Sequence, residues 1–171
     1  IIAIAKRPEA KDLSLTNEGL PVVIFLNDIN NPSNLGAILR TAEAAGATTV
    51  AISKRSADPF SPKALRGAMG STFRLNIVEE MDLDEIVSWA HDNDLVLTAA
   101  DINAEKTYTT IDWSKLRVLV FGSEAHGLNE DELRQMDELV RIEMSGQVES
   151  LNLAVSAGIL LFEAKRQNLS G

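Results

Sequence analysis

Short apolar runs alternate with helix-forming segments along most of this chain. The runs with the character of strands are residues 22–26, 48–52, 73–78, 95–100, 117–121 and 139–142. The segments with helical periodicity are residues 35–45, 62–69, 83–92, 131–136 and 151–166. Strands that alternate with helices pair in parallel, and the connecting helices cover both faces of the sheet. We therefore predict an α/β fold with a mostly parallel sheet and helices on both faces.

Length and composition narrow the class of protein. A chain of 171 residues fits one domain with a well-filled core. It contains no cysteine and only two histidines, so thiol chemistry is excluded and we expect no metal site. No apolar run approaches the roughly 18 residues that cross a bilayer. We expect a soluble, cytoplasmic protein without a membrane partner.

The first twenty residues differ in character from the rest. Residues 6–20 are polar and are interrupted by Pro8 and Gly19, which is typical of a linker. The chain also opens on Ile1 and not on methionine. We therefore interpret residues 1–20 as a linker from an upstream domain, and residues 21–171 as the folded domain.

The net charge of −9 argues against a general nucleic-acid binder, but the charge is unevenly distributed. Residues 1–75 carry a net charge of +3 and residues 76–171 one of −12. Within residues 54–74 only Asp58 opposes the basic side chains, which are Lys54, Arg55, Lys63, Arg66 and Arg74. Such a cluster can contact phosphates even on an acidic protein. A solvated basic face is the alternative.

The segment from Asn30 to Arg40 joins the first apolar run to a helix through several side-chain amides, one glycine and an arginine. The start of a helix presents free backbone N–H groups that suit an anionic ligand. Asparagine and serine are also common capping residues. Ligand binding and capping are both compatible with this segment.

A second segment, Phe121 to Leu128, follows the 117–121 run. Gly122 and Gly127 have the spacing of a phosphate-binding loop, but Leu128 stands where that motif requires lysine. Glu124 lies just after a strand end, where ligands of parallel sheets collect, or else favours the start of the next helix. A hydrolase triad is not favoured, because Ser123 lacks the second glycine of a Gly-x-Ser-x-Gly turn.

A third segment, Ile142 to Leu153, leads into the last helix. Ser150 is a candidate helix cap, and Asn152 needs a partner, which is either the loop itself or a ligand. The helix that follows is apolar on almost all sides, so it lies in the core or packs against a second subunit. We favour the dimer.

These segments together resemble the three signature motifs of the SpoU/TrmH family of RNA 2′-O-ribose methyltransferases. In this chain the motifs read Asn34-x-Gly36-Ala37-Ile38-x-Arg40-Thr41-Ala42, Phe121-Gly122-Ser123-Glu124-x-x-Gly127-Leu128 and Ile142-x-Met144-x-Gly146-x-x-Glu149-Ser150-Leu151-Asn152. The resemblance extends to residues 58–63 and 70–74, and so covers most of residues 20–167.

The resemblance implies a carboxyl-terminal deep trefoil knot and a homodimer with the last helix in its interface. It implies the cofactor S-adenosyl-L-methionine, bound by Thr98, Ala99, Ala100, Gly122, Ile142, Met144 and Leu151. The substrate would be structured RNA, ribosomal more than transfer RNA, contacted by Arg40, Lys54, Arg55, Lys63, Arg66 and Arg74. An RNA-recognition domain often precedes the catalytic domain in such proteins.

The same resemblance implies that the catalytic set is Asn34, Arg40, Glu124, Ser150 and Asn152. The family proposal makes Arg40 a general base. A guanidinium is a weak base, so we expect Arg40 to bind an RNA phosphate in a bidentate manner. The methyl transfer needs proximity and loss of a proton, and no metal.

The chain departs from the family pattern at Glu143, where proline is usual, and at Ala125, where glycine is common. The residues also allow two alternatives to the methyltransferase. A non-catalytic RNA-binding module would not require Asn34, Arg40, Glu124 and Asn152 together. A nucleotide or phosphosugar enzyme with an open α/β sheet would show a motif of its own.

Overall fold

The computed structural model describes residues 6–9, 12–14, 19–146, 148 and 150–169. Within them the strands form one parallel sheet in the order β3-β2-β1-β6-β4-β7-β5. The strands are β1 (Val22–Leu26), β2 (Thr49–Ser53), β3 (Asn76–Met81), β4 (Val96–Ala100), β5 (Lys106–Thr107), β6 (Arg117–Phe121) and β7 (Glu138–Arg141). This arrangement confirms the predicted α/β fold class.

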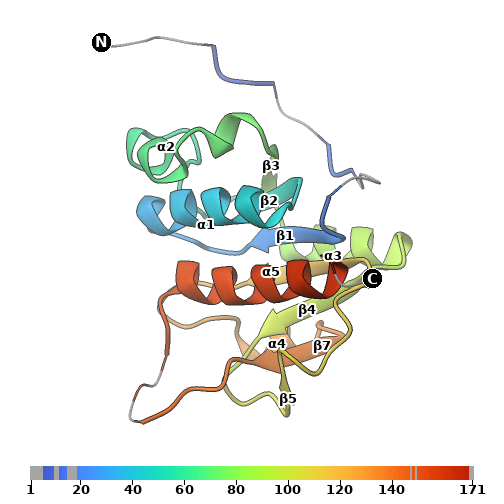
Figure 1. The fold of residues 1–171 in the computed structure, drawn as a ribbon. Coiled ribbons are helices and arrows are strands. Elements are labelled where there is room, and N and C mark those ends of the chain that lie inside the picture. Colours follow the sequence, from blue (N-terminus) through green and yellow to red (C-terminus); the bar gives the residue numbers. More distant parts are fainter. Residues whose placement is uncertain (1–5, 10–11, 15–18, 147, 149, 170–171) are drawn as a thin grey trace.

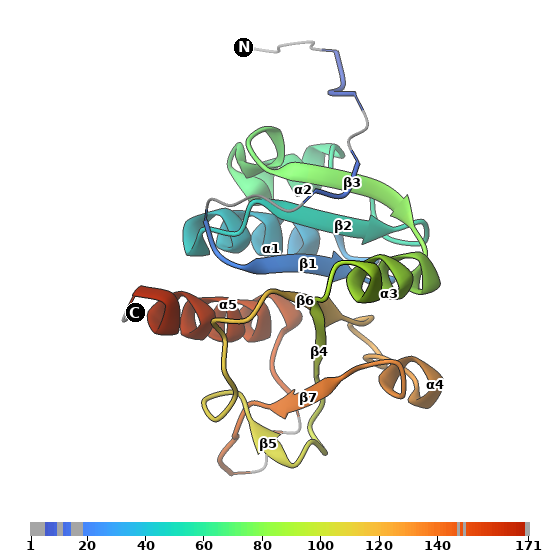
Figure 2. The same ribbon diagram turned by 90° about the vertical axis from the view of Figure 1, so that its right-hand side faces the viewer.

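Helices cover both faces of the sheet (Figures 1 and 2). They are α1 (Pro32–Ala45), α2 (Pro62–Ala68), α3 (Leu83–Asp92), α4 (Glu130–Leu133) and α5 (Leu153–Leu169), with a 3₁₀ turn η1 (Ser71–Phe73). Alternate residues of β1 point to opposite faces, as strand geometry requires. Ile24 packs in the cluster that contains α1 and α5, and Phe25 packs in the cluster that contains α3.

Helix α1 supports most of one face. It packs against α2 and α5. At the crossing with α2 the two backbones come close, since a Cβ atom added to Gly36 would lie 2.3 Å from the carbonyl oxygen of Ala64. Only glycine allows this approach, so the glycine of the first motif fixes the position of α2 on α1.

Several predicted boundaries are wrong, for local reasons. A strand was predicted to begin at residue 73, but Phe73 is the last residue of η1. Met69 and Gly70 have left-handed backbone conformations, and the chain reverses there. The strand itself begins at Asn76. Helix α4 is shorter than residues 131–136, and α5 begins two residues later than predicted. The long connection at residues 102–115 contains the short edge strand β5.

Helix α5 is not a central core helix. Ala157, Leu160 and Leu161 are buried, whereas Val155 and Phe162 are about half exposed. The helix therefore has one face on α1 and the sheet, and a second apolar face on the surface.

The strand order is consistent with the predicted trefoil knot, which stays a prediction. The predicted linker at residues 1–20 lies partly outside the described residues, and no helix or strand occurs in the part of it that is described. None of the helices in the described part of the chain is long and apolar enough to cross a membrane.

Candidate functional site

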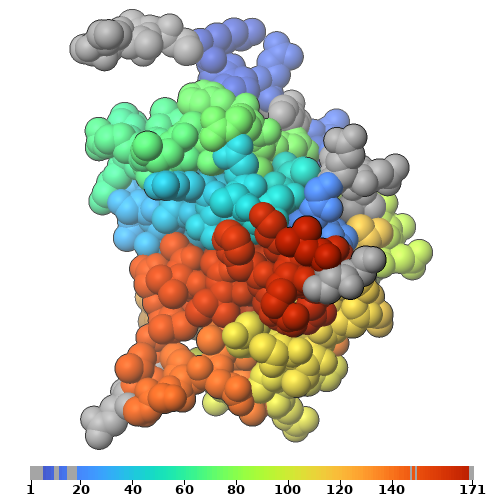
Figure 3. Space-filling model, in the orientation of Figure 1, coloured from blue at the N-terminus to red at the C-terminus, as the bar shows by residue number. Residues whose placement is uncertain are grey.

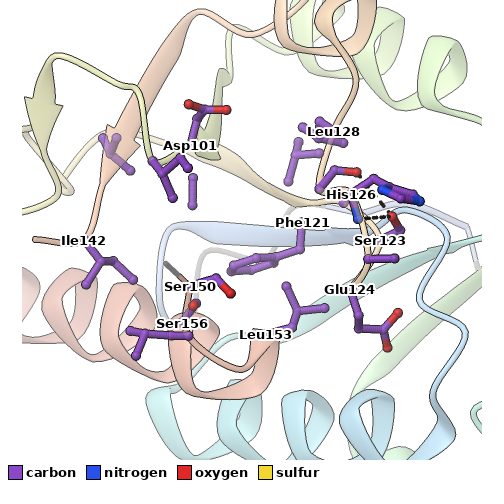
Figure 4. A pocket seen from close by; sticks show the side chains of 18 of the residues that line it. Asp101, Phe121, Ser123, Glu124, His126, Leu128, Ile142, Ser150, Leu153 and Ser156 are labelled. Atoms are coloured by element: carbon purple, nitrogen blue, oxygen red, sulfur yellow. Dashed lines mark hydrogen bonds between the residues drawn. The ribbon is translucent and has the colours of Figure 1, made fainter. Parts of the chain in front are cut away.

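The three motif loops meet at one edge of the sheet. They follow β1, β6 and β7, and parallel strands place their carboxyl ends at the same edge. A cavity of about 430 Å³ lies among the last two loops and the residues that follow β4. Figure 4 shows its side chains converging from the sheet, the loops and the start of α5.

The described lining of this cavity contains acidic side chains but no lysine or arginine. Asp101 and Glu124 contribute carboxylates, and Ile142, Met144 and Leu153 contribute apolar surface. No lysine or arginine occurs among the described residues that line it. The cavity therefore suits a neutral or cationic ligand better than a polyphosphate.

The loop after β6 folds back on itself. The Gly127 N–H donates to the Ser123 carbonyl at 2.8 Å, and the two residues form an isolated antiparallel bridge. A Cβ atom added to Gly122 would lie 2.3 Å from the Gly127 carbonyl carbon. Gly122 is thus required for the closure of this loop, which forms one wall of the cavity.

Glu124 connects this loop to the start of α1. Its carboxylate accepts the backbone N–H groups of Asn30 and Asn31, at 3.2 and 3.1 Å, and the side-chain Nδ2 of Asn34 at 3.4 Å. The alternative that Glu124 serves the start of the following helix is wrong, because α4 begins at Glu130 and has its own cap, Asn129. The negative charge lies instead at the positive end of α1.

Asn152 connects the third loop to the same helix. Its Nδ2 donates to Asn34 Oδ1 at 3.2 Å, while its Oδ1 accepts the Ala154 N–H at 2.9 Å. Asn152, and not Ser150, is therefore the capping residue of α5. Asn152 is also exposed, and its partners are Asn34 and the start of α5. Asn34 thus uses both ends of its amide, one on Glu124 and one on Asn152.

The Asn30–Arg40 segment has the capping role that its sequence allowed, and ligand binding there stays a prediction. Asn31 caps α1, since its side chain accepts the Ser33 N–H at 2.9 Å. Asn34 instead joins the network of Glu124 and Asn152, which we call the amide–carboxylate network. Arg40 lies six residues further along α1, about 9 Å along the axis. It is exposed and has no hydrogen bond or ion pair with the described residues.

The predicted cofactor residues divide into two groups. Ala100, Gly122, Ile142, Met144 and Leu151 line the cavity, as does Ser150 of the predicted catalytic set. Thr98 and Ala99 are fully buried in β4 and do not line it. The Thr98 hydroxyl instead accepts a hydrogen bond from the buried Arg117 at 2.6 Å.

Asp101 and Asn103 are among the polar residues of the lining that the sequence did not predict. The Asp101 carboxylate accepts the Asn103 N–H at 2.6 Å, so the turn after β4 is held at the cavity edge. The position of Asp101 in the sequence could have indicated it, because Asp101 directly follows a predicted strand. Glu124 lies close after a predicted strand in the same way.

The basic cluster is more neutralised than its sequence suggested. Lys54 pairs with Asp82 at 2.8 Å, Arg55 pairs with Asp28 at 2.7 Å, and Arg74 pairs with Glu43. Asp58 is the only carboxylate within residues 54–74, but the fold brings further carboxylates to the cluster from distant segments. Lys63 and Arg66 are exposed and have no ion pair with the described residues.

The Arg74–Glu43 pair is the most strongly perturbed of these ion pairs. Hydrogen bonds from Arg74 and Ser71 lower the pKa of Glu43 from 4.5 to about 2. Elsewhere, the described residues include no cluster of three or more histidine, aspartate or glutamate side chains that could hold a metal ion.

Comparison with known proteins identifies the family. The model of the SpoU rRNA methylase family matches residues 21–162, which is most of the chain. The chain belongs to this family.

Curated relatives agree with this SpoU assignment. An uncharacterized tRNA/rRNA methyltransferase of Synechocystis is 37% identical over 84% of this chain and 53% of its own length. The 23S rRNA (guanosine-2′-O-)-methyltransferase RlmB of Xylella fastidiosa is 35% identical over 93% of this chain and 64% of its own length. The SpoU domain described here thus spans about half to two thirds of these relatives.

Solved SpoU structures have the same fold. The SpoU methyltransferase AviRb from Streptomyces viridochromogenes, in complex with the cofactor AdoMet, superposes with a TM-score of 0.86 at 31% identity. The match covers 95% of this chain and 67% of AviRb. An RNA 2′-O ribose methyltransferase superposes with a TM-score of 0.85 at 32% identity, over 96% of this chain and 62% of that protein.

Proposed function

We propose that this domain transfers a methyl group from S-adenosyl-L-methionine to a ribose 2′-hydroxyl in structured RNA, and that the RNA is ribosomal. The observation that carries the proposal is the amide–carboxylate network of Asn34, Glu124 and Asn152 beside the cavity. The names of the RlmB relatives support ribosomal RNA. We also propose a cytoplasmic location, which the absence of cysteine supports.

The cavity fits this cofactor in size and in charge. Its volume of about 430 Å³ lies in the range of small-molecule sites. When bound, the cofactor supplies a methyl group on a positively charged sulfur. The carboxylates of Asp101 and Glu124 and the lack of lysine or arginine in the described lining suit such a charge. The residues proposed to hold the cofactor are Ala100, Gly122, Ile142, Met144 and Leu151.

The network is proposed to position the acceptor ribose. Glu124 and Asn152 hold the Asn34 amide from both ends, so its orientation is fixed before RNA binds. Such preorganisation helps methyl transfer chiefly by proximity and alignment. Ser150, at the cavity wall, is proposed to contact the same substrate.

Arg40 is proposed to bind a phosphate of the RNA. Its guanidinium is exposed and unpaired within the described residues, so an incoming phosphate has no competing carboxylate there. Two parallel N–H donors would fix the phosphate and thereby the neighbouring ribose.

Cofactor binding and methyl transfer test the proposal separately. Calorimetry should show S-adenosylmethionine binding to the chain, and a radiolabelled methyl group should appear on ribosomal RNA. Arg40→Ala and Arg40→Lys should both retain cofactor binding and lose methyl transfer. Near-full transfer by Arg40→Lys would contradict the bidentate role. Cofactor binding without transfer to any RNA would favour a non-catalytic module, and absence of binding would contradict the function itself.

We also propose that the protein is a homodimer with α5 in the interface. The half-exposed Val155 and Phe162 support this, since an apolar helix face is normally covered. Sedimentation should show a dimer that Phe162→Asp dissociates. A monomeric wild-type chain would contradict this part of the proposal.

A further inference from the structure

Two large apolar side chains project into solvent beside the basic helix α2. Met69 is 67% exposed and Phe73 is 56% exposed. They flank the turn between α2 and η1, and neither lines the cavity. Burial within the chain therefore does not account for these two residues.

The turn holds them in a fixed conformation. Met69 and Gly70 have φ angles of 51° and 93°, so the chain reverses sharply there. Ser71 is buried, and the ion pair of Arg74 with Glu43 ties the end of the turn to α1. A rigid turn presents a side chain to a ligand at little entropic cost.

The ring of Phe73 already takes part in an aromatic contact. Its centroid lies 6.1 Å from that of Phe60, and the guanidinium of Arg7 lies 4.6 Å above Phe60. The remaining exposed part of Phe73 is available to a further flat group.

The helix that leads into this turn carries two basic side chains without an ion pair among the described residues. Lys63 and Arg66 are one turn apart on α2, hence on the same face of that helix, and both are free of ion pairs with described residues. Arg40 is one turn from Glu43, the partner of Arg74. Figure 3 shows α1, in blue to cyan, beside α5 in red, with the green region of α2 and η1 above α1.

We propose that Met69 and Phe73 stack on an unpaired base of the RNA substrate while Lys63 and Arg66 contact its phosphates. This inference rests on the proposed function, since it assigns a second contact to the same RNA. Aromatic side chains beside cationic ones are the usual platform for unstacked bases. The partner is thus a loop or bulge of the RNA and not a regular duplex.

The first test measures binding of a fluorescent single-stranded RNA of about twelve nucleotides to the chain. Phe73→Ala should weaken binding about ten- to a hundredfold, and Phe73→Leu nearly as much, whereas Phe73→Trp should retain it. Leu116→Ala removes an exposed apolar side chain just before β6, which β2 and β1 separate from β3 in the sheet, and should leave the affinity unchanged.

Salt dependence separates stacking from charge. Arg66→Gln should reduce the slope of log affinity against log salt concentration by about 0.7, because one phosphate contact with a single strand is lost. Phe73→Ala should leave that slope unchanged. An altered slope in Phe73→Ala would contradict a stacking role.

Calorimetry with S-adenosylmethionine and sedimentation are run on each variant. If Phe73→Ala keeps cofactor binding and wild-type RNA affinity, the stacking surface is wrong and the proposed function stands. If the wild-type chain binds no cofactor, the proposed function fails first. If Phe73→Ala dissociates a dimer without changing RNA affinity, a second copy of the chain covers this surface and the inference is overturned.

Discussion

Asn152 donates its side-chain N–H to the side-chain oxygen of Asn34, 118 positions earlier in the sequence. The same residue caps α5 through its own oxygen. One side chain thus begins the last helix and fixes the orientation of an amide at the start of the first helix. Asn152 thus has a structural role at the start of α5 and a proposed role in positioning Asn34. A substitution that removes only one of these bonds can separate the two roles.

Asn152→Asp should retain stability and lose activity. Aspartate still accepts the Ala154 N–H at the positive end of α5, but it cannot donate to Asn34. Asn152→Ala should lose both, with a fall of about 1 kcal/mol in the free energy of unfolding. Chemical denaturation and methyl-transfer rates measure the two effects. A fully active Asn152→Asp variant would show that the bond to Asn34 is dispensable.

Glu124→Gln should reduce methyl transfer by up to about a hundredfold, because the start of α1 and Asn34 lose a charged acceptor and shift. Cofactor affinity should fall less, since most of the cavity wall is unchanged. Glu130→Gln, a change to a nearby glutamate outside the network, serves as the matched control. Equal rates for both variants would exclude a special role for Glu124.

Gly122→Ala should abolish measurable cofactor binding, because its Cβ atom cannot coexist with the Gly127 backbone and the loop must open. Gly127→Ala should have a smaller effect, since nothing lies within 4 Å of its added Cβ atom and only the backbone at φ 65° is strained. Calorimetry with S-adenosylmethionine on both variants measures which one loses more cofactor affinity. A stronger loss in Gly127→Ala would contradict the closed loop.

The Glu43–Arg74 pair should make stability depend on acid pH. The pKa of Glu43 is lowered to about 2 in the folded chain, so the stabilisation is complete above about 4.5 and is lost as the pH falls toward 2. Glu43→Gln should reduce the slope of unfolding free energy against pH in that window. Because Glu43 is partly solvated, the change is modest. An unchanged slope would show that the pair contributes nothing.

Much of the fold could be predicted from the alternation of apolar runs and helical segments. The strand at 117–121 and the helix at 83–92 have the predicted bounds, because their apolar periodicity is uninterrupted. The turn at 69–73 was missed, since the left-handed conformation of Met69 carries no side-chain signal. The strand order, in which β6 lies between β1 and β4, is likewise invisible in local sequence.

The candidate site, like the fold, could be predicted from the sequence only in part. The motifs predicted that Asn34, Glu124 and Asn152 matter, and the structure shows that they touch one another. Local sequence could not show that the basic cluster is largely paired, because Asp28, Glu43 and Asp82 arrive from other elements. Nor could it show that Arg40 lies apart from the network.

The sheet order has a consequence for how the domain is made. Central strand β1 pairs with β6, with Ile24 opposite Leu119, so its second edge stays open until the chain has grown past residue 121. The segment from β1 to β3 can assemble early, because its strands are adjacent in both sequence and space. The proposed methyl-transfer site, however, also needs Asn152, which directly precedes α5. A growing chain that has not reached residue 152 therefore lacks the bond that fixes the Asn34 amide, even when β1 to β3 have already assembled.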